Sequence, residues 1–195
     1  MSAVNLTLMS EAEFLGWQLR QDELYEFVDG VPVPRWKAMS GATLRHDRVL
    51  VNALLSLGTQ LRGGKCRPMT ADVAVRIPKR NYRRPDLTVD CGTAKSDREL
   101  AAPEPRFAME VLSTSTTNFD LFRKLEEYKT VATLRVVLLV DTESPQVTVH
   151  HRVNGIWQSN TLEGLDKTIE LPEIEARMTL ADLFEGIVFE ETAGS

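Results

Sequence analysis

Two carboxylates fall on successive strands of the predicted core. Asp86 opens the short run 87–89, and Glu110 interrupts the apolar run 107–112. Both runs are typical of strands, because the first is entered through a proline and the second is too short for a helix. At about 4 Å and an effective dielectric near 20, two such charges repel by roughly 4 kcal/mol. A divalent cation or a lysine would turn that repulsion into a binding site, and Lys124 follows on the next predicted helix.

These residues also have structural interpretations. Asp86 alone fits a strand end or a turn, and Glu110 could form a purely structural salt bridge with Lys124. A carboxylate inside an apolar strand should be nearly fully buried, however, and buried charges are paired or bind metal. In the functional interpretation Asp86 and Glu110 are ligands of Mg²⁺ or Mn²⁺, together with a backbone carbonyl near Val111 and several waters. Lys124 would orient the attacking water or stabilise developing charge.

The order of these motifs resembles the PD-(D/E)XK nuclease superfamily and, more closely, its Uma-type family of bacterial restriction endonucleases. The resemblance covers nearly the whole chain, and it is carried by 25–30 (YEFVDG), His46, 84–86 (RPD), 110–113 (EVLS) and 124–128 (KLEEY). It implies an endonuclease that depends on Mg²⁺ or Mn²⁺ and has DNA as a transient partner. The resemblance is also compatible with a homodimer. The superfamily's usual lysine would stand at Leu112, so its role would pass to Lys124.

Four further side chains are candidate accessory residues. Glu26 is either an extra acidic metal ligand or an exposed hairpin residue. Asp120 could hold the Lys124 ammonium group, or it could be an acid that is favoured in the first turn of a helix by the helix dipole. Tyr128 fits the core, with a hydroxyl that could reach the site. His46 precedes a helix, where it could contact phosphate, cap the helix or remain exposed.

One concentrated basic run lies directly before Asp86. It contains Lys79, Arg80, Arg83 and Arg84. Such a run is usually a solvated turn, but phosphate contacts would be needed beside a metal that cleaves nucleic acid. The run therefore predicts either an exposed turn or the nucleic-acid-binding patch.

Composition sets the class of protein. The 195 residues are 43% hydrophobic, which predicts one domain over 1–195. A net charge of −5 and a pI near 5.3 argue against non-specific coating of DNA, though not against a local basic patch. Two cysteines, Cys66 and Cys91, fit neither a disulfide framework nor a zinc site, so we expect free thiols in a reducing cytoplasm. Residues 1–8 lack the pattern of a secretion signal, and no apolar run could span a membrane, so we expect a soluble cytoplasmic protein.

The remaining pattern predicts an α/β fold with a mixed sheet and a restriction-endonuclease-like core. The order of core elements is helix, strand, strand, strand, helix, strand, with an N-terminal hairpin and a C-terminal hairpin plus a short helix. The expected helices are a short one after the capping box at 10–13, then 44–61, 119–129 and 180–184. The expected strands are a hairpin at 25–33, then 72–77, 87–89, 107–112, 135–140 and a second hairpin at 147–161.

Two classes of function fit this sequence. The first is a metal-dependent phosphodiesterase that cuts DNA. The second is a nuclease-fold binding or assembly module whose acidic cluster no longer turns over. The acidic pI and the absence of a recognisable target-recognition domain favour the module, whereas intact Asp86, Glu110 and Lys124 favour the enzyme.

Overall fold

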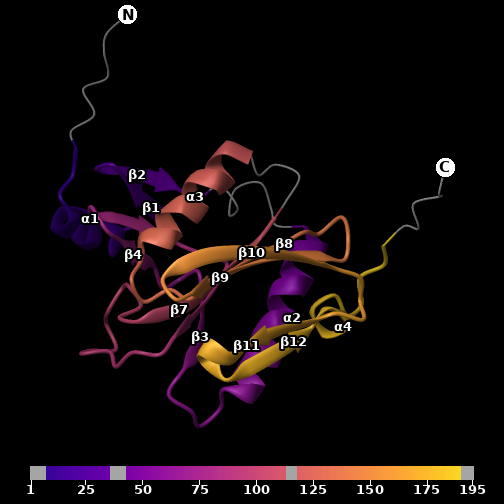
Figure 1. Cartoon of the computed structure of the whole chain (residues 1–195). Coiled ribbons are helices and arrows are strands. Elements are labelled where there is room, and N and C mark those ends of the chain that lie inside the picture. Colours follow the sequence, from indigo (N-terminus) through magenta and orange to yellow (C-terminus); the bar gives the residue numbers. More distant parts are fainter. Residues whose placement is uncertain (1–7, 36–42, 113–117, 190–195) are drawn as a thin grey trace, which may run out of the picture.

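A six-stranded mixed sheet with a helix on each face organises the molecule. The structure is a computed structural model that describes residues 8–35, 43–112 and 118–189. Helix α2 (Leu44–Gln60) lies on one face of the sheet and α3 (Asn118–Thr130) on the other (Figure 1). The short helices α1 (Glu11–Gln18) and α4 (Leu180–Leu183) lie towards the two ends of the chain. This architecture confirms the predicted mixed α/β class.

The large sheet has the order β10-β9-β8-β7-β6-β3. Its strands are β3 (Arg67–Thr70), β6 (Leu87–Asp90), β7 (Pro105–Val111), β8 (Val136–Val140), β9 (Gln146–Val153) and β10 (Ile156–Glu163). Every neighbouring pair is antiparallel except β7 and β8. Parallel neighbours need a long crossover, and α3 supplies it. The C-terminal ends of β7 and β8 therefore lie side by side, and Glu110 is the second-last residue of β7.

Side chains of β6 and β7 alternate between the two faces, as they must on a pleated strand. Leu87 and Met109 pack on the face covered by α2, whereas Ala108 packs towards α3. Leu87 is paired with Met109, so the next antiparallel pair is Asp86 and Glu110. Both carboxylates consequently project from neighbouring strands on the α3 side of the sheet.

A second, four-stranded sheet carries the N-terminal hairpin. Its order is β2-β1-β5-β4, with β1 (Tyr25–Val28), β2 (Val31–Pro34), β4 (Val75–Ile77) and β5 (Asn81–Arg83). The predicted hairpin around Asp29 is confirmed, and so is the capping box that begins α1 at Ser10. Phe14 of α1 stacks on Phe27 of β1 at 4.5 Å between ring centroids, which fixes α1 against this sheet.

Several boundaries differ from the sequence-based expectation. The predicted strand 72–77 is the shorter β4, and it joins the small sheet rather than the core sheet. The core position is taken by β3, which the pattern did not reveal because Pro68 and two exposed residues obscure its alternation. The basic stretch 79–84, expected to be one turn, contains strand β5. The pair β11 (Thr168–Leu171) and β12 (Ala176–Thr179) was also not predicted.

The expectation of free thiols is wrong. Cys66 and Cys91 form a disulfide, although they lie 25 residues apart. The reason is the antiparallel pairing of β3 with β6, in which Arg67 is opposite Asp90. Cys66 directly precedes Arg67 and Cys91 directly follows Asp90. The antiparallel register therefore places the two cysteines opposite each other.

Among the described residues, no helix is both long enough and apolar enough to cross a membrane.

Candidate functional site

Asp86 is fully buried at the start of β6, and donors from three parts of the chain surround it. Its Oδ2 accepts the backbone N–H of Val111 at 2.7 Å. Its Oδ1 lies 2.6 Å from Nη2 of Arg35, the residue that follows β2. The imidazole Nε2 of His46, in the first turn of α2, lies 3.3 Å from Oδ2. The fold therefore surrounds this carboxylate with a guanidinium group, an imidazole ring and a backbone N–H group.

Glu110 is the other carboxylate of the site, and its side chain is 3% exposed. The hydroxyl of Tyr128 donates a hydrogen bond to its Oε1 at 2.7 Å. The ammonium of Lys124 lies 3.8 Å from the same oxygen. Lys124 and Tyr128 stand one turn apart on α3, so both side chains leave the same face of that helix and reach down to β7. The structure thus brings Glu110, Lys124 and Tyr128 into contact, with Asp86 opposite Glu110 at the neighbouring strand.

Glu26 lies next to this cluster and has three partners of its own. Its Oε1 accepts the backbone N–H of Arg84 at 3.1 Å and lies 3.2 Å from the Lys124 ammonium. Its Oε2 accepts a hydrogen bond from Arg83 Nη1 at 2.7 Å. The residue is 5% exposed. Each oxygen faces a cation or an N–H group, so in this structure Glu26 pairs with Lys124 and Arg83.

The electrostatics of Lys124 follow from its two carboxylate neighbours. Burial alone would lower the pKa of Lys124, but the charges of Glu110 and Glu26 outweigh it and hold that pKa above its usual value. Burial alone would likewise raise the pKa of Glu26, but Lys124 and Arg83 together keep it below its usual value. The ammonium group therefore stays protonated at neutral pH. It can act as a cation and hydrogen-bond donor, but not as a general base.

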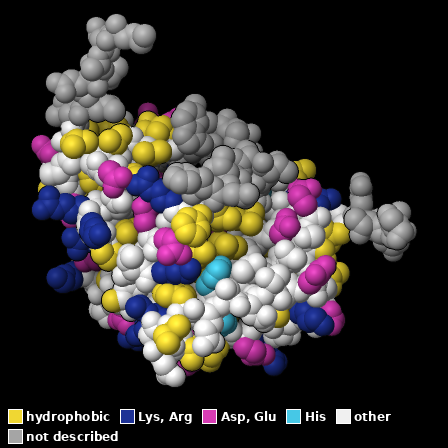
Figure 2. All heavy atoms as spheres, turned by 45° about the horizontal axis from the view of Figure 1, so that its top comes forward, with side chains coloured by type: hydrophobic (Ala, Val, Ile, Leu, Met, Phe, Trp, Pro, Cys, Tyr) yellow, Lys and Arg dark blue, Asp and Glu magenta, His cyan; other side chains and the backbone are white. Residues whose placement is uncertain are grey.

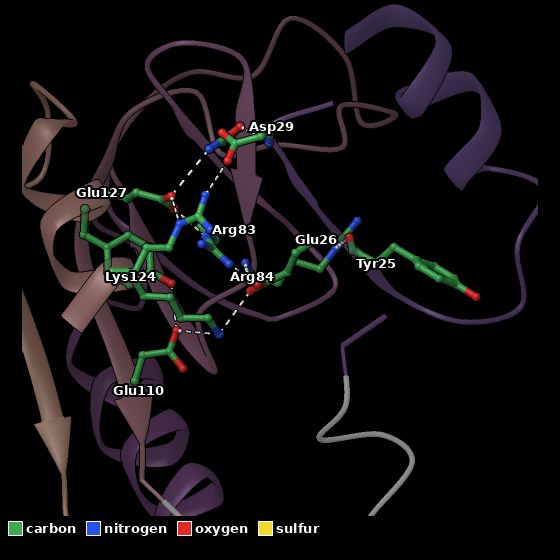
Figure 3. A network of polar contacts seen from close by, with 11 residues as sticks. Tyr25, Glu26, Asp29, Arg83, Arg84, Glu110, Lys124 and Glu127 are labelled. Carbon is green, nitrogen blue, oxygen red and sulfur yellow. Dashed lines mark hydrogen bonds and ion pairs between the residues drawn. The ribbon is translucent and has the colours of Figure 1, made fainter. Parts of the chain in front are cut away.

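An alternating chain of charges extends from Lys124 to the surface (Figure 3). Glu26 contacts Arg83, whose Nε lies 2.5 Å from Glu127 Oε2. Glu127 in turn accepts a hydrogen bond from Arg123 Nε at 3.2 Å, and Arg123 reaches the exposed Asp29 at 2.6 Å. The network links β1, β5 and α3, and so it fixes the helix that carries Lys124 relative to the small sheet.

His46 lies in the site rather than at the surface. It is 5% exposed, and within the described part of the chain neither ring nitrogen has a hydrogen bond of good geometry. Thr43 caps α2 by accepting the backbone N–H of His46, so the cap does not involve the imidazole. This side chain is positioned near Asp86 with unused hydrogen-bonding capacity.

The basic run before Asp86 divides into two parts. Arg83 and Arg84 are 3% and 2% exposed, and the guanidinium of Arg84 donates to the backbone carbonyls of Tyr25, Ala71 and Asp72. The expectation that Arg83 and Arg84 contact nucleic acid is therefore wrong for this conformation, because both guanidinium groups are engaged inside the protein. Lys79 and Arg80 are exposed at the tip of the β4–β5 hairpin.

The exposed pair sits on an unusual turn. Lys79 and Arg80 have φ values of 71° and 75°, a left-handed conformation that non-glycine residues adopt rarely. Two consecutive residues of this kind form a tight hairpin turn and aim both side chains at solvent. Figure 2 shows Lys and Arg side chains gathered along its left edge, the side on which Figure 1 places α1 and β4.

Asp120 occupies the first turn of α3, with an exposed side chain. Its negative charge adds to those of Glu110 and Glu26 in raising the pKa of Lys124. Asp120 thus contributes to the field at Lys124, and its position also suits the dipole at the N-terminus of the helix.

The residues present fit a hard divalent cation. Within 8–35, 43–112 and 118–189 there is no cluster of three His, Cys, Asp or Glu side chains that could hold a metal. Mg²⁺, however, usually binds one or two carboxylates and keeps several waters. Asp86 and Glu110 offer two carboxylates from an adjacent strand pair, and the Val111 N–H orients the first of them.

Sequence reasoning missed three contributors to this site. Arg35 carried no signal, because it follows a hairpin strand 51 residues before Asp86 and only the tertiary fold joins the two. The backbone N–H of Val111 and the carboxylate of Glu127 were missed for the same reason. The expected repulsion between Asp86 and Glu110 is thereby reduced, since Arg35 and Lys124 each bring a positive charge to one of them.

Known proteins match most of this chain. The model of the Uma2 family, described as "Putative restriction endonuclease", matches residues 11–181. An uncharacterized protein of Synechocystis sp. is 28% identical over 183 residues, which cover 93% of this chain and 94% of that protein. A second uncharacterized protein of the same organism is 27% identical over 167 residues, covering 84% and 92%.

A solved structure has the same fold. It is the crystal structure of a putative nuclease belonging to DUF820 from Anabaena variabilis, with a TM-score of 0.72 and 15% sequence identity. The match covers 92% of this chain and 99% of that chain. The predicted restriction-endonuclease-like architecture is therefore confirmed at the level of fold.

Proposed function

Because the chain belongs to the Uma2 family of putative restriction endonucleases, we propose that it is a Mg²⁺- or Mn²⁺-dependent endonuclease that hydrolyses phosphodiester bonds of DNA. Asp86 and Glu110 hold the cation, and Lys124 is the catalytic cation beside it. A bacterial enzyme acting on DNA would work in the cytoplasm. All of the proposed site residues come from one chain, so the site does not require a homodimer.

One observation carries the proposal. Two buried carboxylates face each other on adjacent strands, and a protonated lysine lies 3.8 Å from one of them. A purely structural cluster of this kind is costly to bury, and replacing it with apolar side chains would often be neutral or stabilising. A catalytic site explains why the charges are retained in a well-packed sheet.

The chemistry follows from the roles of the side chains. A bound Mg²⁺ or Mn²⁺ would polarise the scissile phosphate and acidify a water. Lys124 donates hydrogen bonds to the attacking water or to the developing negative charge, and its raised pKa keeps it protonated for this task. Tyr128 fixes Glu110 by donating to Oε1, and the Val111 N–H fixes Asp86. Glu26 positions Lys124 without itself taking part in the reaction.

Lys79 and Arg80 are the proposed contacts to the DNA backbone. They lie at an exposed tip, and cations of this kind bind phosphate without reading sequence. An acidic protein with a basic hairpin tip would bind DNA weakly and transiently. This suits a nuclease that releases DNA after cleavage and does not coat it.

The test is nicking of supercoiled plasmid by the purified protein, with Mn²⁺ and with EDTA. We expect nicking in Mn²⁺ only. Lys124→Ala should reduce the rate by about 100-fold or more, the scale on which loss of one positioned catalytic group registers. Lys129→Ala is the matched control, because Lys129 pairs with Glu126 on the surface of the same helix.

Absence of cleavage by the folded wild-type protein would exclude this assignment for duplex DNA. It would favour the second function class, a binding or assembly module with a silent site. Full activity in Lys124→Ala, with the fold checked by circular dichroism, would remove Lys124 from the mechanism.

A further inference from the structure

Arg35 is a side chain of this site to which neither the sequence pattern nor the family description points. It stands directly after β2, where its backbone N–H donates to Leu24 O at 3.0 Å. Its side chain is 16% exposed, and its Nη2 lies 2.6 Å from Oδ1 of the fully buried Asp86. Arg35 therefore contacts a proposed metal ligand while its side chain keeps some exposure to solvent.

The two oxygens of Asp86 are held in different ways. Oδ2 accepts a hydrogen bond from the Val111 N–H, a backbone group fixed within β7. Oδ1 faces the end of a long side chain with several rotatable bonds. The imidazole Nε2 of His46 also lies 3.3 Å from Oδ2. A cation that binds Asp86 through Oδ1 would meet the guanidinium of Arg35. Two positive charges around one carboxylate oxygen repel each other, so the guanidinium group and the cation compete for Oδ1.

We propose that Arg35 is a displaceable counter-ion that neutralises Asp86 in the metal-free protein and binds a phosphate oxygen of DNA once a divalent cation takes its place. This inference rests on the proposed function. A guanidinium group cannot lose its proton in a protein, so a displaced Arg35 remains a cation and needs an anion. Its planar fork matches two phosphate oxygens, and its partial exposure gives it access to a substrate arriving from solvent.

The alternative is a permanent salt bridge that only stabilises buried Asp86. The two roles predict opposite responses of metal affinity. Removing a permanent orienting partner should weaken the metal site, whereas removing a competitor should strengthen it. The sign of the change therefore separates them, independently of cleavage.

The first experiment is calorimetric titration of Mn²⁺ into the full-length protein without DNA. Arg35→Gln should bind Mn²⁺ about 10-fold more tightly than wild type, because a competing charge is gone. Its metal-free melting temperature should fall, since buried Asp86 loses a counter-ion. Arg35→Lys keeps the charge and should stay near wild type. Arg76→Gln is the control, because it breaks a more exposed arginine–carboxylate pair, with Glu11, outside the site.

The second experiment measures DNA affinity in the slowly cleaving Lys124→Ala background. Adding Mn²⁺ should tighten binding of a short duplex, and adding Arg35→Gln should remove most of this gain. Arg35→Lys should restore part of it, because lysine supplies charge without the fork.

The outcomes separate this inference from the proposed function. If wild-type protein binds no Mn²⁺, both are wrong. If wild type binds Mn²⁺ and Arg35→Gln binds it equally or more weakly, only the displaceable role of Arg35 is wrong. If Mn²⁺ binds more tightly but DNA affinity is unchanged, Arg35 does not contact phosphate.

Discussion

The base and the tip of the β4–β5 hairpin carry similar basic residues, but those at the base are buried in ion pairs and those at the tip are exposed. At the base, Arg83 is buried between the carboxylates of Glu26 and Glu127. At the tip, Lys79 and Arg80 are exposed on a left-handed turn. Only two residues separate these positions in the sequence. The difference shows that the position of a basic residue in the hairpin, rather than its charge, decides whether its side chain is buried in the ion-pair network or faces solvent.

The base of the hairpin determines where Lys124 lies. Arg83 pairs with Oε2 of Glu26, and the Lys124 ammonium lies 3.2 Å from Oε1 of the same carboxylate. The same arginine holds Glu127 on α3, the helix that carries Lys124. The tip makes no such connection, so the two regions should respond very differently to the same kind of substitution.

The largest expected effect is that of Arg83→Met. This change keeps much of the side-chain volume but leaves Glu26 and Glu127 without their shared cation. Breaking a buried ion pair by removing one partner costs about 3–5 kcal/mol, so the free energy of unfolding in urea should fall by that amount. Arg80→Met at the tip should stay within about 0.5 kcal/mol of wild type, as exposed substitutions do. Equal losses in the two variants would contradict the division between base and tip.

The second prediction concerns the pH dependence of the base. The folded pKa of Glu26 lies below its usual value of 4.5, so its ionisation stabilises the folded state above that pH. This contribution is lost as the pH falls from 4.5 through the lower folded pKa. We expect wild type to be more stable than Glu26→Gln at pH 7 and pH 5, with the difference shrinking below pH 4.5. A difference that stays constant down to pH 3 would show that the charge of Glu26 is not what stabilises the base.

The smallest effect is expected at the tip. Lys79→Gln combined with Arg80→Gln should leave stability unchanged but weaken DNA binding. If both side chains contact phosphate, the slope of log K against log salt should become shallower by roughly 1.8. The control removes two exposed charges from the 92–105 connector, at Lys95 and Arg98. An identical loss in the control would mean that net charge matters and the tip does not.

The parts of this account that follow from local pattern could be predicted from the sequence. Strand periodicity placed Asp86 and Glu110 on neighbouring core strands, and helical spacing placed Lys124 beside the buried face that holds Tyr128. The N-terminal hairpin and the capping box of α1 were confirmed because each depends on a few adjacent residues.

The rest depends on long-range register, which one sequence does not reveal. The disulfide of Cys66 with Cys91 follows from the pairing of β3 with β6, and β3 itself was not recognised. Arg83 was expected to face DNA because a basic run resembles a surface. Its burial became evident only when β5 paired with β1 and put Arg83 beside Glu26.

The most direct test of the central claim is the response of the melting temperature to Mn²⁺. A ligand that binds only the native state at 100 times its Kd stabilises by about 2.7 kcal/mol, or about 5–10 °C for a chain of this size. We predict this gain for wild type and for the control Glu126→Gln, whose exposed carboxylate pairs with Lys129. Glu110→Gln should lose most of it. An equal gain in Glu110→Gln would contradict a metal site at Asp86 and Glu110.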